Sequence, residues 1–225
     1  MSVSSSRSPP KTPRPSRSGQ FGKAVHSRLM KALNELPRRL FLPAEAATVS
    51  DDQPAPLGNG RFVPPVDVVA LMLEALDLQG SERVLDIGSG SGYQAALLGR
   101  LAREVISIEI DEALAERSAS VLMALGCNNV RVIHADASAG WPENAPYQAI
   151  VVGAAATRLP TALIDQLELG GRLVVALGDD DAQLVERLCK HVDRLACDTV
   201  GACRLDMLSS PQRTPSSFPW AAHKK

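Results

Sequence analysis

The densest group of candidate functional residues is the glycine-rich stretch Asp86-Ile87-Gly88-Ser89-Gly90-Ser91-Gly92, whose first two residues end the apolar run 84–87. Where a strand turns into a helix, glycines let the backbone approach a ligand closely, and the helix N-terminus offers free N–H groups. Glu109 should close the next strand and is placed to hold both ribose hydroxyls of a nucleoside. Asp136 should follow the third strand, where it is placed to accept a hydrogen bond from an adenine amino group. An acid that only caps its own loop is the alternative for Asp136.

Two ligands compete for this predicted pocket. A dinucleotide site usually reads GxGxxG, with its pyrophosphate on the helix N-terminus. Here the spacing is GxGxG, and Asp86 stands two residues before the first glycine. A carboxylate there would repel a pyrophosphate but suits the cationic amino and sulfonium groups of S-adenosylmethionine (SAM). The sequence therefore predicts SAM as cofactor, and a nicotinamide oxidoreductase is the alternative. The residues predicted to bind SAM are Asp86, Gly88, Ser89, Gly90, Ser91, Gly92, Glu109 and Asp136.

The elements that must position these residues alternate between strands and helices. Apolar runs of Val, Ile and Leu predict strands at 84–87, 104–109, 130–134, 148–152 and 172–177. Helices are expected at 93–102, from Asp111 as a cap to Gly126 as a stop, and near 160–168. Continuous apolar strands between helices indicate a parallel sheet covered on both faces. The predicted fold class is an α/β, Rossmann-like methyltransferase fold with a mostly parallel sheet.

The flanking segments are less regular. An apolar stripe of Val25, Leu29, Leu33 and Leu36 predicts a helix over 22–36 that ends at Pro37. The proline-rich stretch 37–65 should be mostly loop, and a helix over 67–78 follows that Asp67 is placed to cap. Residues 182–208 fit either a helix or an antiparallel strand pair at 183–190 and 199–208.

Length and composition indicate one folded domain. The chain has 225 residues, is 45% hydrophobic and 22% charged, and has no run of 18 apolar residues that would span a membrane. We expect a disordered, basic leader rich in Ser and Pro at 1–20, one domain at 21–210 and a flexible tail at 211–225. Within the domain, 21–80 should form the substrate side and 81–210 the SAM-binding core.

Charge and cysteine content restrict the partners. Residues 1–34 carry seven bases and no acid, so the rest of the chain is acidic, which argues against a dedicated nucleic-acid binder. Cys127, Cys189, Cys197 and Cys203 form no CxxC pair, so neither a metal site nor a disulfide framework is expected. Without an apolar stretch after the N-terminal arginines, we expect no secretory signal and a cytoplasmic location.

The stretch VLDIGSGSGYQAALLGRLAREVISIE resembles the SAM-binding half of the protein-L-isoaspartate O-methyltransferases. So do GWPENAPYQAIVVGAAA (140–156) and LGGRLVVALG (169–178), and upstream VHSRLMKAL, LPRRLFLP (36–43) and DDQPAPLGNG (51–60). The resemblance covers about residues 23–208. It implies a cytoplasmic, monomeric SAM-dependent O-methyltransferase that methylates L-isoaspartyl residues of damaged proteins or peptides for repair. It also implies strands rather than a helix at 183–208.

The implied reaction needs few catalytic groups. A carboxylate with a pKa of about 3.5–4 is already ionised at neutral pH, so no general base is required. Attack on the sulfonium methyl mainly needs proximity and alignment. The absence of a His/Ser/Asp constellation therefore does not argue against an enzyme.

The acceptor loop departs from the family pattern. Where the family has Gly-Gln-Thr-Ile-Ser, this chain has Gly60-Arg61-Phe62-Val63-Pro64. Pro64 has neither a hydroxyl nor an N–H group, and Phe62 removes a second hydroxyl. The loss of two donors from a carboxylate site costs about 2–4 kcal/mol. Arg61 has a guanidinium that fits a carboxylate, but a solvated loop arginine is the interpretation that we favour.

Two softer departures are Gln148 and Gly153, which stand where the family usually has Asp and Thr. Together, the departures keep two alternatives open. One is a paralogue that methylates a different acceptor, and the other is a SAM-binding protein whose acceptor site has decayed.

Overall fold

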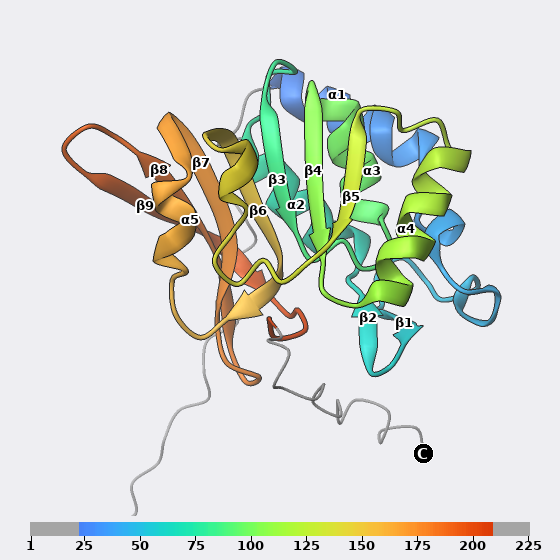
Figure 1. The fold of residues 1–225 in the computed structure, drawn as a ribbon. Coiled ribbons are helices and arrows are strands. Elements are labelled where there is room, and N and C mark those ends of the chain that lie inside the picture. Colours follow the sequence, from blue (N-terminus) through green and yellow to red (C-terminus); the bar gives the residue numbers. More distant parts are fainter. Residues whose placement is uncertain (1–22, 209–225) are drawn as a thin grey trace, which may run out of the picture.

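The computed structural model describes residues 23–208, so the expected leader at 1–20 and tail at 211–225 lie outside the described residues. Its main sheet has seven strands in the order β5-β4-β3-β6-β7-β8-β9 (Figure 1). Strands β3 to β7 run parallel to one another, whereas β8 pairs antiparallel with β7 and β9 pairs antiparallel with β8. The strands are β3 (Arg83–Ile87), β4 (Glu104–Glu109), β5 (Val130–His134), β6 (Tyr147–Ala156), β7 (Leu167–Gly178), β8 (Gln183–Lys190) and β9 (Leu195–Cys203). The predicted α/β fold with a mostly parallel sheet is confirmed.

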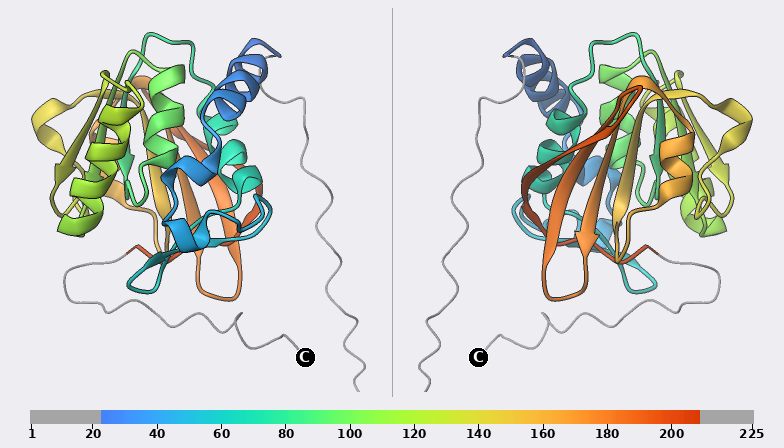
Figure 2. Two further views of the ribbon diagram at one scale, coloured as in Figure 1. Left: turned by 90° about the vertical axis from the view of Figure 1, so that its right-hand side faces the viewer. Right: turned by 90° about the vertical axis from the view of Figure 1, so that its left-hand side faces the viewer.

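Alternate side chains of the central strands pack on opposite faces of the sheet, as the twofold period of a strand requires. One face belongs to a core cluster that contains Val84, Val105 and Val151, and the other to a cluster that contains Leu85 and Ile150. The first cluster also takes in apolar residues of α1 (Lys23–Glu35), α2 (Val66–Leu76), α3 (Tyr93–Leu101) and α4 (Glu112–Ala124). Helix α5 (Thr161–Asp165) packs in the second, and Figure 2 shows α1 and α5 on opposite sides of the sheet.

Helix α4 has the ends that the sequence predicts. Asp111 caps its start, because one of its carboxylate oxygens accepts a hydrogen bond from the Leu114 amide at 3.1 Å. Gly126 follows its end with a φ of +67°, a conformation that suits glycine. The prediction for α2 is wrong in one respect: Pro65 precedes the helix, and Asp67 lies inside its first turn. Pro65 already has the extended backbone that a residue before a helix needs, so the helix begins one residue before Asp67.

The stretch 37–65 is more ordered than the loop that we predicted. It contains two short 3-10 helices, Arg38–Phe41 and Ala44–Ala46, and a hairpin of β1 (Ala55–Gly58) and β2 (Arg61–Val63). Asn59 and Gly60 form the turn, with φ of 50° and 70°. Two successive positive φ values at an Asn-Gly pair are typical of a tight β-hairpin turn. The hairpin lies at the lower edge of the molecule in Figure 1.

The segment 182–208 forms strands, as the family resemblance implied, and the helical alternative is wrong. Leu184, Leu188 and Val192 would share one apolar face of such a helix, yet Leu188 is buried whereas Leu184 and Val192 are 45% and 88% exposed. A register shift between Val185 and Glu186 breaks strict alternation, which made the strand pattern hard to recognise. The expected helix near 160–168 is shorter than predicted because β7 already begins at Leu167.

Residues 23–208 contain neither a membrane-spanning helix nor a cluster of metal-binding side chains. No helix in this part of the chain is long and apolar enough to cross a membrane. No group of three or more His, Cys, Asp or Glu side chains in the same part is arranged to hold a metal ion.

Candidate functional site

The main cavity lies at the carboxyl ends of the parallel strands, next to the β1–β2 hairpin. The chain changes direction across the sheet between β3 and β6, and ligands of such sheets bind beside that point. Of the predicted residues, the cavity is lined by Gly88, Ser89, Gly90, Ser91, Glu109, Asp136 and the 61–64 loop. The geometry therefore brings six of the eight predicted cofactor residues into one cavity with the predicted acceptor loop, whereas Asp86 and Gly92 do not line it.

The glycine loop is held tightly against the sheet. Gly88, Gly90 and Gly92 have φ of +87°, +53° and +84°, so each uses the conformational freedom of glycine. The Gly88 and Ser89 amides both donate to the Ile108 carbonyl oxygen, at 2.8 and 3.2 Å. Side chains are thereby kept away from the cavity floor, and the loop backbone forms its surface.

Gly153 of β6 completes this floor. A Cβ atom there would lie 3.0 Å from the Gly88 carbonyl oxygen and 3.2 Å from the Gln94 side-chain nitrogen. The departure from threonine at this position therefore lets β6 approach the glycine loop closely. Gln148, the other departure, lies away from the cavity and accepts a hydrogen bond from the Arg83 amide at 2.8 Å.

Glu109 joins the end of β4 to the glycine loop. Its Oε2 accepts from the Gly90 amide at 2.8 Å, and its Oε1 accepts from the Ile110 and Asp111 amides at 2.9 and 3.0 Å. The side chain is buried yet lines the cavity. Three backbone donors therefore fix the carboxylate in one orientation at the cavity.

Asp86 lies behind the cavity rather than among its lining residues. It is fully buried, and its two oxygens accept hydrogen bonds from the Gln94 side-chain Nε2 at 2.8 Å and from the Ser107 hydroxyl at 2.6 Å. Burial raises the pKa of Asp86 to about 6, against the lowering effect of the Ser107 and Gln94 bonds and with a small addition from the charge of Glu109. The predicted direct contact of Asp86 with SAM remains a prediction, and this geometry makes Asp86 a support for the loop.

Asp136 lies on the rim of the cavity after β5. Its Oδ1 accepts a hydrogen bond from the Ser138 amide at 2.8 Å, so it does cap its own loop. It is exposed and lines the cavity at the same time. The two interpretations given by the sequence are therefore compatible, because Asp136 both caps its loop and lines the cavity.

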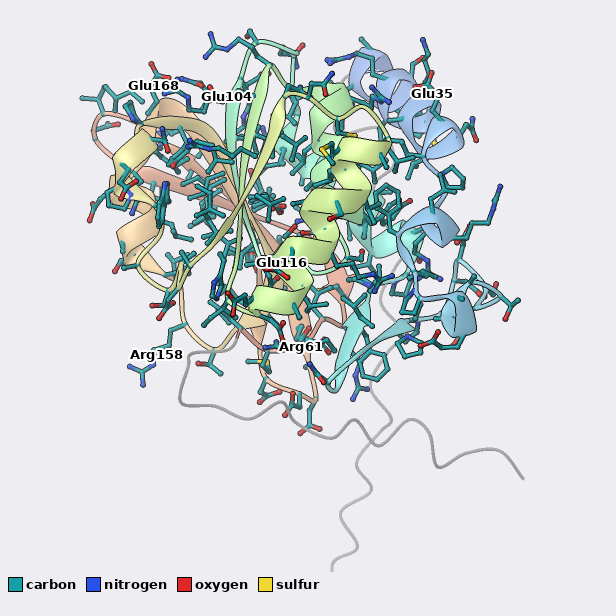
Figure 3. All side chains as sticks on the ribbon, turned by 45° about the vertical axis from the view of Figure 1, so that its right-hand side comes forward. Glu35, Arg61, Glu104, Glu116, Arg158 and Glu168 are labelled. Carbon is teal, nitrogen blue, oxygen red and sulfur yellow. The ribbon has the colours of Figure 1, made fainter. Side chains whose placement is uncertain are left out.

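The acceptor loop is held from behind by a buried arginine that the sequence did not single out. Arg38 is 1% exposed, and its guanidinium donates to the carbonyl oxygens of Ser50, Gln53 and Pro64 at 2.6, 2.8 and 2.8 Å. An ion pair with Asp51 at 3.4 Å adds to this. Arg61 itself is partly buried and lines the cavity mouth, and Figure 3 shows it at the lower edge of the molecule.

Asp206 is a second cavity residue that sequence reasoning missed. It follows β9, lines the cavity and accepts a hydrogen bond from the Phe62 amide at 2.9 Å. A second cavity shares Phe62, Pro64 and Asp206 with the first. The only sequence signal was an acid inside the ambiguous 182–208 segment, which carried no expectation of a contact with Phe62.

Fold and site together define a class. A parallel sheet with a GxGxG loop after its central strand, and an acid that ends the neighbouring strand and faces the same cavity, is the architecture of the SAM-dependent methyltransferases. A structure from Plasmodium falciparum in complex with S-adenosyl-L-homocysteine has this fold, with a TM-score of 0.71 and 22% identity over 81% of this chain and 90% of that chain.

Within that class, the chain belongs to the protein-L-isoaspartate(D-aspartate) O-methyltransferase family, whose model matches residues 18–209. It is 46% identical to protein-L-isoaspartate O-methyltransferase 1 of Rhodopseudomonas palustris (strain HaA2) over 179 residues, 78% of this chain and 73% of that protein. The corresponding enzyme of Syntrophus aciditrophicus (strain SB) is 41% identical over 80% of this chain and 84% of its own length. A solved protein-L-isoaspartate O-methyltransferase is 25% identical with a TM-score of 0.69, over 83% of this chain and 62% of that chain.

Proposed function

We propose that this protein transfers the methyl group of SAM to the free carboxylate of L-isoaspartyl residues in damaged proteins, as a repair reaction. The observation that carries the proposal is that the glycine loop, Glu109 and the 61–64 loop line a single cavity in a chain of this family. A methyl donor on the glycine loop and a carboxylate at the 61–64 loop would then lie within reach of each other.

The lining residues fit SAM better than a dinucleotide. The cavity is lined by the acids Glu109, Asp136 and Asp206, and Arg61 is the one base among its described lining residues. In the loop, the amides of residues 88, 89, 90 and 92 already donate to protein oxygens, which leaves few N–H groups for a pyrophosphate. We infer that the loop from Gly88 to Gly92 would hold the methionine part of SAM, Glu109 the ribose and Asp136 the adenine.

When bound, SAM supplies a methyl group on a sulfonium, and the chain's own residues position the acceptor. The side chains of Leu57, Val63 and Val69 line the cavity and would exclude water from the acceptor carboxylate. Arg61 offers a guanidinium that fits the two carboxylate oxygens. SAM would supply its methyl group to one of these oxygens with loss of the carbon–sulfur bond, which would give a methyl ester and S-adenosylhomocysteine. The ester then closes to a succinimide, which reopens in part to normal aspartate.

The first test of this proposal is transfer of a labelled methyl group from SAM to an isoaspartyl peptide, after a thermal shift with SAM has shown that the cofactor binds. Methylation of the isoaspartyl peptide would support it. If NAD raised the Tm and SAM did not, the proposed cofactor, and the proposal with it, would be contradicted.

A different acceptor, or a decayed acceptor site, is the second candidate. It is favoured by Phe62 and Pro64, which bring no hydroxyl to the acceptor side of the cavity. The double variant Phe62→Thr with Pro64→Ser separates the two candidates. Activity on isoaspartate that appears only in the double variant would favour the second candidate, whereas equal activity of both proteins would favour the first.

We also propose that the protein is a cytoplasmic monomer with residues 21–210 in one domain. Support for the compartment comes from the four cysteines, which are all unpaired, as expected where thiols are kept reduced. Light scattering coupled to gel filtration would test the monomer, and fractionation of cells would test the location.

A further inference from the structure

Asp206 occupies an unusual place for a carboxylate in an enzyme whose acceptor is itself a carboxylate. It lines both the main cavity and the second one, so it stands where the two meet. An ionised acid there would repel an incoming isoaspartyl carboxylate. The inference below rests on the proposed function, because it concerns how that acceptor is held.

The backbone around Asp206 is fixed from two strands. The Asp206 carbonyl oxygen accepts from the Ala155 amide of β6 at 2.8 Å. The Gln183 side chain of β8 accepts from the Leu205 amide at 2.7 Å and donates to the Leu205 carbonyl oxygen at 3.1 Å. The carboxylate is therefore held in place at the cavity mouth rather than on a free end of the chain.

Hydrogen-bond donors for an acceptor carboxylate are few on this side of the cavity. Pro64 has no N–H group, Phe62 and Val63 have no hydroxyl, and the Phe62 amide is already donated to Oδ2 of Asp206. The other oxygen of Asp206, Oδ1, accepts no hydrogen bond from the described residues. The remaining donors are the guanidinium groups of Arg61 in the main cavity and Arg204 in the second one, and Asp206 itself once it carries a proton.

We propose that Asp206 is an acceptor-binding residue of this enzyme, and that in its protonated form it donates a hydrogen bond from Oδ1 to the isoaspartyl carboxylate. The bond goes to the carboxylate oxygen that does not attack, so the other oxygen stays free to take the methyl group. The proton remains on Asp206 throughout, and the methyl transfer balances without it. Two carboxyl groups that share one proton are a stable arrangement, whereas two ionised ones repel each other.

The electrostatics around Asp206 are compatible with this role. Burial raises the pKa of Asp206, and the hydrogen bond from the Phe62 amide and the charge of Arg61 oppose that effect. Arg61 of β2 lines the main cavity with it, and Arg204 lines the second cavity with it. From β6 and β8 it meets the backbone of Ala155 and the neutral amide of Gln183. The acceptor is an α-carboxyl group of pKa about 3.3–3.7, so it stays ionised when Asp206 takes up a proton.

The test compares wild type with Asp206→Asn by steady-state kinetics on one isoaspartyl peptide between pH 5.5 and pH 8. The asparagine keeps an oxygen for the Phe62 amide and offers an N–H donor at every pH. For the wild type, KM for the peptide should fall by up to about tenfold for each unit that the pH falls, because the protonated fraction of Asp206 rises at that rate above its pKa. The KM of Asp206→Asn should be independent of pH and at least tenfold below that of the wild type at pH 8, with kcat and SAM affinity little changed.

Two further variants keep the result interpretable. Asp206→Leu removes the donor and should raise KM above that of Asp206→Asn at every pH. Asp198→Asn neutralises an exposed acid on β9 and should behave as the wild type. Identical pH profiles and KM values for wild type and Asp206→Asn would overturn the inference while leaving the proposed function intact. Absence of methylation by both proteins at every pH, with SAM bound, would instead overturn the proposed function, and the inference with it.

Discussion

Substitution of Arg38 by methionine tests the link between the N-terminal segment and the acceptor loop. The guanidinium is buried and donates to four carbonyl oxygens, two of which belong to Val63 and Pro64 in the acceptor loop. Methionine fills similar space but leaves these four oxygens without their donor. Asp51, the ionic partner, has a side chain that is 69% exposed, so water would solvate its charge after the substitution.

The expected cost follows from these contacts. An unsatisfied, partly buried acceptor costs about 1–3 kcal/mol, and loss of one member of a buried charged network costs about 3–5 kcal/mol in total. A domain of this size loses about 2–4 °C of Tm for each kcal/mol, so Arg38→Met should melt about 6–20 °C below the wild type. SAM affinity should change little, because no bond of Arg38 reaches the glycine loop, whereas KM for the acceptor peptide should rise.

The assay is thermal unfolding with and without SAM, followed by peptide kinetics below the Tm of the variant. Arg39→Met is the matched control, because Arg39 is the next residue and is exposed. Its Tm should stay within about 2 °C of the wild type, as surface substitutions usually cost no more than about 0.5 kcal/mol. If Arg38→Met and Arg39→Met had the same Tm, the argument that Arg38 holds the acceptor loop would be refuted.

Three further predictions concern the cofactor side. Glu109→Gln should weaken SAM binding by about tenfold to a hundredfold in calorimetry, because it removes a charged acceptor for the ribose. The control Glu112→Gln changes an exposed acid and should leave SAM affinity unchanged. Equal SAM affinities of the two variants would contradict the role of Glu109. Gly153→Ala should weaken SAM binding by about tenfold, because its Cβ would meet the Gly88 carbonyl oxygen at 3.0 Å, and unchanged affinity would mean that the loop can move at no cost. Because burial raises the pKa of Asp86 to about 6, the folded state binds the Asp86 proton more tightly than the unfolded state does. Protonated Asp86 therefore stabilises the folded state below about pH 4, and this stabilisation is lost as the pH rises through 6. Between pH 4 and pH 7.5, the free energy of unfolding of Asp86→Asn should therefore rise by about 2–3 kcal/mol relative to that of the wild type, as measured by urea unfolding. Parallel pH curves for the two proteins would refute this.

Local patterns were sufficient to predict the cofactor half. Runs of Val, Ile and Leu marked the five parallel strands, and the glycine spacing marked the loop after β3. Because carboxyl ends of parallel strands meet at one edge of a sheet, Glu109 and Asp136 could be placed in one cavity without any structure. Asp86 shows the limit of spacing arguments, since it shares its face of β3 with Val84 rather than pointing to the cavity.

The acceptor side depends on contacts that no local pattern contains. The Asp206 carboxylate meets the Phe62 amide across 144 positions of the chain, and the segment of Asp206 was itself ambiguous between helix and strand. Arg38 acts through backbone carbonyl oxygens, which every residue has, so nothing in the sequence identifies its partners. An arginine between apolar residues and prolines was the one available signal.

The most direct test of the proposed function is an acid-quenched mass-spectrometric assay with SAM and two peptides of the same sequence, one isoaspartyl and one aspartyl. Thermal shift would first show that SAM binds, so that a negative result concerns the acceptor and not the cofactor. The proposal predicts a methyl ester or succinimide on the isoaspartyl peptide alone, and it predicts that this occurs despite Phe62 and Pro64 in the acceptor loop. Methylation of neither peptide, or of both equally, with SAM bound would contradict it.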